Sequence, residues 1–349
     1  MRMPWGPTER IATLALRDGD FSVIGCLSFE ERCIAVPSGY GMVERRPANT
    51  LLLQMDGDPE AFPNRLAESA RRIDENRRRL LTSDSRFEIV RADLLAREDA
   101  LIETYGGLRP RLGDSVVLDI TCLPKRYFCF LLKMLLRQRE PANVIVTYVQ
   151  AGRGYAKERL AEDPMLSDHL PGFPPLINDA NLIAISVGYE SLNLYSLLEM
   201  YGEDRRRKIL LAFPPNGTSI RRQWSAVRQF TETRTGAFGR DLADLPSEVR
   251  QTMGYGKVDV DYVAAWDAEG VYRLLRRWRS DCNGLWLAPF GAKPHTLGMA
   301  LFALEQSSPL FYTQPRSYNP RYSDGIGKGW AYVVKWQGIP CYARAESIL

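Results

Sequence analysis

The sequence predicts an α/β protein made of two tandem Rossmann-like units with mainly parallel sheets, related to each other by an internal pseudo-repeat. Three observations predict this class. The chain has 349 residues, which is more than one ordinary core holds and enough for two. In each half, apolar runs of strand length alternate with longer helical patterns, as in parallel sheets that are covered on both faces. The turns after corresponding strands also carry similar residues in the same order.

The first half contains five apolar runs of strand length. They span residues 21–27, 50–55, 87–92, 115–120 and 143–149. Between them, the spacing of apolar positions predicts helices over Asn64–Leu81 and Leu123–Arg139. We therefore expect a first Rossmann-like domain over residues 1–155.

A change of composition marks the predicted boundary. Glycines and prolines gather between residues 151 and 180, which predicts a linker or an excursion over 156–180. The alternation then resumes, with strand-like runs at 181–187, 208–213, 258–263, 284–289 and 309–313. We expect a second Rossmann-like domain over 181–349, ending in a lid rich in glycine and aromatic residues and in edge strands.

The predicted repeat depends on three pairs of turns. The first strands end in Cys26–Arg32 and Val187–Ser191, each with an aromatic residue and a glutamate. The fourth strands end in short turns that carry Lys125 and Lys293, which are 168 positions apart. The fifth strands carry Tyr148 and Tyr312, 164 positions apart. Three matches in one order at nearly one offset favour a duplicated unit.

Composition excludes several classes of protein. The net charge of +4 arises from 46 basic and 42 acidic side chains, so a general affinity for nucleic acid is not implied. No apolar stretch has the length of a signal peptide core or a membrane span, and we expect a cytoplasmic protein with no membrane partner. Six cysteines form no C-x-x-C pair and only two histidines accompany them, so no metal and no cofactor are expected.

The turns after the fourth strands are the first candidate ligand-binding sites. In open α/β sheets, ligands bind beyond the carboxyl ends of the strands. Asp119, Thr121 and Lys125 combine a carboxylate, a hydroxyl and an ammonium just before a helix N-terminus, where an anion such as phosphate is favoured. The corresponding residues in the second half are Gly291, Lys293, His295 and Thr296. The alternative is that Asp119 and Thr121 cap the helix and the lysines are solvated.

Carboxylates follow the first and second strands. No G-x-G-x-x-G occurs at the first turn, so binding of an NAD-type pyrophosphate is disfavoured. Glu30, Glu31 and Glu190 suit a ribose hydroxyl, a base amine or general-base work on water, and they are the candidate catalytic residues; otherwise they stabilise helix N-termini. Asp56 ends the second strand, where a ribose ligand is common, or it is a turn residue before Gly57.

The segment from Tyr318 to Trp330 is the third candidate. Tyr318, Asn319 and Tyr322 lie beside several glycines and cations, a composition suited to a lid that stacks on bases. The alternative is a terminal hairpin with turn glycines. The sequence has no Ser-His-Asp order, metal box or P-loop, so an enzyme would depend on carboxylates.

The turn D-I-T-C-L-P-K and the apolar helix that follows it resemble those of CARF domains, the Rossmann-like nucleotide sensors of CRISPR-associated and related defence proteins, and P-F-G-A-K-P-H-T is similar. Two such domains in one chain resemble SAVED-type sensors. The resemblance assigns ligand contacts to Asp119, Thr121 and Lys125, whereas Cys122 and Leu123 replace the double glycine of the family. It implies cyclic oligonucleotides as ligands.

We therefore expect a nucleotide-binding or cyclic-oligonucleotide-binding sensor or adaptor in a bacterial defence or signalling complex. No effector domain is recognisable in this chain, so a separate effector protein is expected. Two alternatives stay open. One is a nucleosidase or N-glycosidase that uses a carboxylate at a ribose C1′ of a nucleoside or NAD. The other is a scaffold subunit without catalysis. The sequence does not decide between a monomer and a homo-oligomer.

Overall fold

The structure is a computed structural model of the whole chain. It describes residues 5–8, 21–39, 47–57, 63–83, 86–156, 158, 160–164, 168–175, 180–188, 206–213 and 258–342. The chain divides into two compact units. Unit 1 is made of Met1–Asp163 and Arg316–Leu349, and unit 2 of Pro164–Pro315, so unit 2 is inserted into unit 1.

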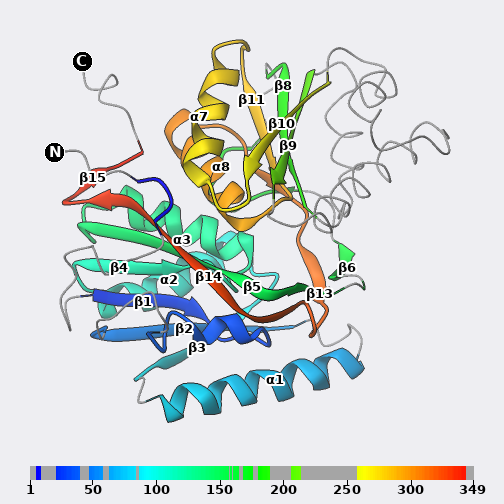
Figure 1. Ribbon diagram of the computed structural model, residues 1–349. Coiled ribbons are helices and arrows are strands. Elements are labelled where there is room, and N and C mark those ends of the chain that lie inside the picture. The colour runs from blue at the N-terminus through cyan, green and yellow to red at the C-terminus, as the bar shows by residue number, and fades with distance from the viewer. Residues whose placement is uncertain are drawn as a thin grey trace. The chain divides into compact units, whose positions relative to one another are not determined.

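Unit 1 is built on a seven-stranded sheet with the order β15-β14-β5-β4-β1-β2-β3 (Figure 1). Its strands are β1 (Phe21–Cys26), β2 (Asn49–Asp56), β3 (Glu88–Asp93), β4 (Ser115–Asp119), β5 (Asn143–Tyr155), β14 (Ser323–Trp336) and β15 (Ile339–Pro340). The first five strands of the chain pair in parallel, whereas β14 and β15 are antiparallel. The order β3-β2-β1-β4-β5 is the Rossmann order, and it reverses between β1 and β4.

The strands of unit 1 form because they are continuous apolar runs. All six residues of β1 and all five of β4 are buried, which is the pattern of strands covered on both faces. The connecting helices are η2 (Glu31–Ile34), α1 (Pro63–Thr82), α2 (Glu98–Leu108), η3 (Arg109–Arg111) and α3 (Lys125–Arg137). α2 begins with two acidic residues, which favour a helix N-terminus, and it packs against α3.

Unit 2 contains a parallel four-stranded sheet with the order β10-β9-β8-β11. Its strands are β8 (Leu182–Val187), β9 (Arg206–Phe213), β10 (Val258–Ala264) and β11 (Leu285–Pro289). The short strand β12 (Phe311–Tyr312) follows a parallel bridge between Leu310 and Leu287 of β11. The helices described here are α7 (Ala268–Arg279), which Asp267 caps, and α8 (Lys293–Gln306).

Gly298 allows α7 and α8 to approach closely. A Cβ atom at this position would lie 2.4 Å from the carbonyl oxygen of Ala268 and 2.9 Å from the Val271 Cβ. Any larger side chain would therefore separate the two helices.

The two sheets share one order of strands. When only the parallel strands of each sheet are numbered in chain order, the order across the sheet is third, second, first, fourth in both: β3-β2-β1-β4 and β10-β9-β8-β11. Lys125 and Lys293 are the first residues of α3 and α8, the helices that follow the fourth strands.

The structure divides the chain differently from the prediction at its C-terminal end. The C-terminal strands were expected in the second domain, but β14 pairs with β5 over most of its length and so belongs to unit 1. The segment over 156–180, predicted as a linker or an excursion, contains β6 (Ala161–Pro164), which pairs with β13 (Pro315–Tyr318), and β7 (Asp168–His169), which pairs with β12. Sequence periodicity does not reveal such backbone pairing with a distant segment.

Candidate functional site

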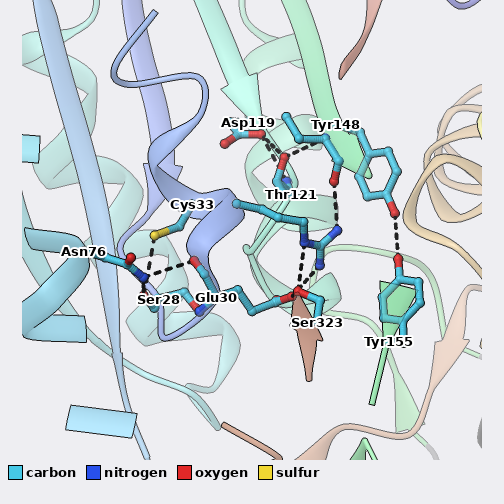
Figure 2. A network of polar contacts seen from close by, with 11 residues as sticks. Ser28, Glu30, Cys33, Asn76, Asp119, Thr121, Tyr148, Tyr155 and Ser323 are labelled. Carbon is cyan, nitrogen blue, oxygen red and sulfur yellow. Dashed lines mark hydrogen bonds and ion pairs between the residues drawn. The ribbon is translucent and has the colours of Figure 1, made fainter. Parts of the chain in front are cut away.

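The candidate site lies in unit 1, where the strand order reverses. The loops after β1 and β4 leave the sheet at neighbouring positions, since these two strands pair in parallel. The first loop leads into η2 and the second into α3. A buried network of polar contacts joins them to β5, β14 and α1 (Figure 2).

A buried ion pair between Arg32 and Glu30 is the centre of this network. Their side chains are 3% and 8% exposed. Arg32 Nη2 donates to Glu30 Oε2, and Arg32 Nε donates to Ser323 Oγ at 3.1 Å. Ser323 Oγ in turn donates to the same Glu30 oxygen, so the three side chains form a closed ring of hydrogen bonds. Arg32 Nη1 donates to the carbonyl of Val149 in β5 at 2.8 Å.

Asp119 and Thr121 hold the turn after β4 against β5. Asp119 Oδ1 accepts hydrogen bonds from the backbone N–H and the hydroxyl of Thr121, and from the hydroxyl of Thr147 at 3.3 Å. The Thr121 hydroxyl accepts from the backbone N–H of Val149 at 2.9 Å. Val149 therefore connects this turn to Arg32, because its N–H bonds to Thr121 and its carbonyl to Arg32.

The loop after β1 is also tied to α1. Asn76 of α1 is buried, and its Nδ2 donates to the carbonyls of Ser28 at 2.9 Å and Glu30 at 3.2 Å. Cys33 Sγ donates to the Ser28 carbonyl at 3.5 Å. These bonds fix the backbone of the loop from which Glu30 projects.

Tyrosines surround the guanidinium on the side of β5 and β14. The Arg32 carbon Cζ lies 5.7 Å from the ring centre of Tyr155, within cation–π range. Tyr155 bonds through its hydroxyl to Tyr148 at 3.2 Å and packs edge-on against Tyr322. Tyr322 also packs against Tyr318.

The charges of these groups follow from their surroundings. Burial lowers the pKa of Arg32, but the Glu30 carboxylate and the nearby tyrosines outweigh it, so that pKa lies well above its ordinary value. Burial raises the pKa of the Cys33 thiol to about 12 and holds that of Tyr322 well above its usual range. The network thus has a permanent cation, a neutral thiol and a neutral phenol at neutral pH.

The carboxylates predicted as catalytic residues are engaged in ion pairs. Glu30 binds Arg32, and Glu31 Oε1 lies 2.8 Å from Arg79 Nη1 of α1. Glu190 lies outside the described residues. Asp56 is exposed at the end of β2 and forms an ion pair with Arg91 of β3.

Lys125 is buried at the first position of α3, after Pro124. It follows the turn that carries Asp119 and Thr121, and those two residues are hydrogen-bonded to each other. The predicted capping by Asp119 or Thr121 is wrong, because α3 has Pro124 at its N-cap and no side-chain cap. Both side chains instead bond toward β5.

In unit 2 the predicted residues lie at the start of α8. His295 is fully buried; its Nδ1 lies 3.3 Å from Ser186 Oγ and its Nε2 lies 2.9 Å from the Ala264 carbonyl. This ring links the ends of β8 and β10, which is a structural role. A Cβ at Gly291 would lie 2.1 Å from Ser186 Oγ, so only glycine fits there. Thr296 is fully buried, and Lys293 is partly exposed.

The predicted lid is packed against unit 1. Asn319 is buried, and its N–H donates to the Leu160 carbonyl at 2.9 Å. Tyr322 bonds through its backbone to Asn319 and Ala156. The glycines of this segment serve the pairing of β14 with β5, since a Cβ at Gly327 would lie 2.9 Å from the Gln150 carbonyl and Gly325 has a φ of 69°.

Sequence reasoning missed Arg32 and Ser323. They lie 291 positions apart, and nothing in the local pattern of either residue indicates that they meet. The one available signal was the sequence F-E-E-R, in which a cation follows two carboxylates directly after a buried strand.

Within the part of the chain that the structure describes, no group of three or more His, Cys, Asp or Glu side chains is arranged to hold a metal ion. The described helices also include none that is long and apolar enough to cross a membrane.

Comparison with known proteins gives no family. No family model and no curated protein matches the chain. Among solved structures, the cytoplasmic domain of a prokaryotic cation chloride cotransporter is similar at 11% identity, over 87% of this chain and 98% of that chain, with a TM-score of 0.24. A likeness of that size carries no information about function.

Proposed function

We propose that this chain binds a nucleotide or cyclic oligonucleotide at the carboxyl ends of β1 and β4 in unit 1. The observation that carries the proposal is the strand order, which reverses between these two strands. Ligands of open α/β sheets bind beside such a reversal. Charged residues gather on both loops there: Glu30, Glu31 and Arg32 after β1, and Lys125 after β4.

Lys125 is the residue of the β4 turn that suits a phosphate group. It begins α3, whose first backbone N–H groups and partial positive charge also favour an anion. Asp119 and Thr121 serve this site indirectly, because their hydrogen bonds to Thr147 and Val149 hold the turn in place.

The two candidate catalytic carboxylates that the structure describes favour binding over catalysis, because both are held in ion pairs. Glu30 and Glu31 each bond to an arginine, and a general base needs a carboxylate that is available to take a proton. The Cys33 thiol is held protonated, so it does not serve as a nucleophile.

We also propose that units 1 and 2 are copies of one ancestral unit. The common strand order and the equivalent places of Lys125 and Lys293 support this relationship. The role that follows is that of a sensor that passes ligand binding to a separate effector in a defence or signalling complex.

Isothermal titration calorimetry with a panel of mononucleotides, cyclic dinucleotides and cyclic oligoadenylates tests the proposal. The change Lys125→Ala should weaken binding about tenfold or more, because a charge-assisted hydrogen bond is lost.

Arg109→Ala is the matched control, since Arg109 is an exposed cation in η3, before the amino end of β4. Equal affinities of Lys125→Ala and the control would contradict the proposed site. Release of free base from a nucleoside or NAD during the titration would favour the N-glycosidase alternative.

A further inference from the structure

The ring of Arg32, Ser323 and Glu30 has the chemistry of an anion-binding position. Two donors from different parts of the chain, the Arg32 guanidinium in η2 and the Ser323 hydroxyl in β14, converge on one oxygen, Glu30 Oε2. A guanidinium and a hydroxyl that share one anionic oxygen can bind a carboxylate or a phosphate equally well.

We propose that Arg32 and Ser323 bind a phosphate group of the ligand, and that the Glu30 carboxylate fills this position until the phosphate displaces it. The inference rests on the proposed function, since it assigns a ligand contact within that same site. Glu30 would then act as an internal competitor that sets the affinity for phosphate.

Exchange of one anion for another avoids the main cost of opening a buried ion pair. Removing Glu30 alone would leave the Arg32 cation buried and unpaired, which is strongly unfavourable. A phosphate brings its own negative charge, so Arg32 stays paired throughout. The displaced carboxylate moves toward water, because Phe29 and Glu31 on either side of Glu30 are partly exposed.

Arg32 also has hydrogen-bonding capacity beyond its present contacts. A guanidinium carries five N–H donors. Arg32 makes three hydrogen bonds to the described residues, to Glu30, Ser323 and Val149. A phosphate has more oxygens than one carboxylate and can accept two parallel bonds from the same guanidinium.

The change Glu30→Gln tests this idea, with inorganic pyrophosphate as the probe. The glutamine amide has no negative charge and so competes less well than the carboxylate for Arg32 and Ser323. The variant should therefore bind pyrophosphate at least about tenfold more tightly than the wild-type chain. Adding Ser323→Ala should reverse much of that gain, because one of the two converging donors is lost.

Glu31→Gln is the matched control, since it removes the same charge from the next residue and also breaks an ion pair, with Arg79. It should leave the affinity for pyrophosphate within about twofold of the wild type, as a partly exposed pair contributes little. Equal gains in Glu30→Gln and Glu31→Gln would reflect net charge alone and overturn the proposal.

Two further results separate this inference from the proposed function. If nucleotides bind in a manner that depends on Lys125, but Glu30→Gln has no effect on pyrophosphate, the inference fails and the proposed site stands. If Glu30→Gln does not fold, Ser323→Ala alone should weaken pyrophosphate binding to the chain severalfold, whereas Ser317→Ala in β13, a buried serine, should not. Equal affinities of these two serine variants would overturn it.

Discussion

Two neighbouring glutamates of the β1 loop both form ion pairs with arginines, but one pair is buried and the other is partly exposed. Glu30 and Arg32 form an ion pair that is almost fully buried, whereas Glu31 and Arg79 form one that is 33% and 49% exposed. The buried pair is costly to break from one side, and the exposed pair is screened by water. Sequence can identify both glutamates as charged residues after a strand, but not which of them faces inward.

The reactivity of Cys33 measures how tightly this loop is held, because its thiol is hydrogen-bonded to a carbonyl of the same loop. Burial raises its pKa from an ordinary 9.0 to about 12, so the native thiol should react slowly with iodoacetamide at pH 8.5. Cys122, which is partly exposed after β4, should react faster. Mass spectrometry of alkylated peptides measures both rates.

The same shift predicts a dependence of stability on pH. Between pH 9 and about 12 the unfolded chain loses the Cys33 proton while the folded chain retains it, so the free energy of unfolding should fall as pH rises through this window. Cys33→Ala should flatten that fall in urea titrations. An unchanged slope in the variant, or fast native alkylation of Cys33, would show that the loop opens readily.

At the scale of elements, a lysine of β14 caps the C-terminal end of α3, the helix that begins with Lys125. Lys335 of β14 is buried, and its Nζ donates to the carbonyl of Leu135 in the last turn of α3 at 3.4 Å, and to those of Gln138 at 2.7 Å and Arg139 at 3.2 Å just beyond it. The last carbonyls of a helix lack partners within the helix, and the ammonium supplies a donor to that of Leu135.

Lys335→Met should therefore lower the free energy of unfolding by about 1–3 kcal/mol, because buried carbonyls lose their donor. Urea denaturation measures the loss. Lys328→Met on the same strand is the control, since Lys328 is exposed and its Nζ lies 4.8 Å from the ring centre of Trp330. It should cost less than about 1 kcal/mol. Equal losses in the two variants would mean that Lys335 does not cap α3.

Local patterns predicted the strands well and their partners poorly. All ten predicted apolar runs overlap strands, because runs of apolar and β-branched residues leave a direct mark on composition. α2 was not predicted, since Gly106 and Gly107 interrupt its pattern. For Tyr318–Trp330 the sequence left both a lid and a terminal hairpin open, because its glycines suit close pairing with β5 as well as they suit a mobile loop.

At the scale of the molecule, the first unit is completed by β14, a strand from the C-terminal part of the chain. β14 supplies Ala331 and Val333 to the same buried cluster as Phe21 of β1 and Val117 of β4. Unit 1 is therefore made of two segments that unit 2 separates in the sequence. Its core forms only after these two segments have come into contact.

Tyr332→Ala tests which unit the C-terminal strand stabilises. Tyr332 is fully buried in β14 opposite Val146 of β5, and its truncation should cost about 3–5 kcal/mol. Hydrogen exchange measured by mass spectrometry should therefore become faster in β1, β4 and β5, while β8 and β11 stay protected. Leu287→Ala in β11, also fully buried, should produce the opposite pattern. Faster exchange in β8 and β11 of Tyr332→Ala would instead place the C-terminal strand with the second unit.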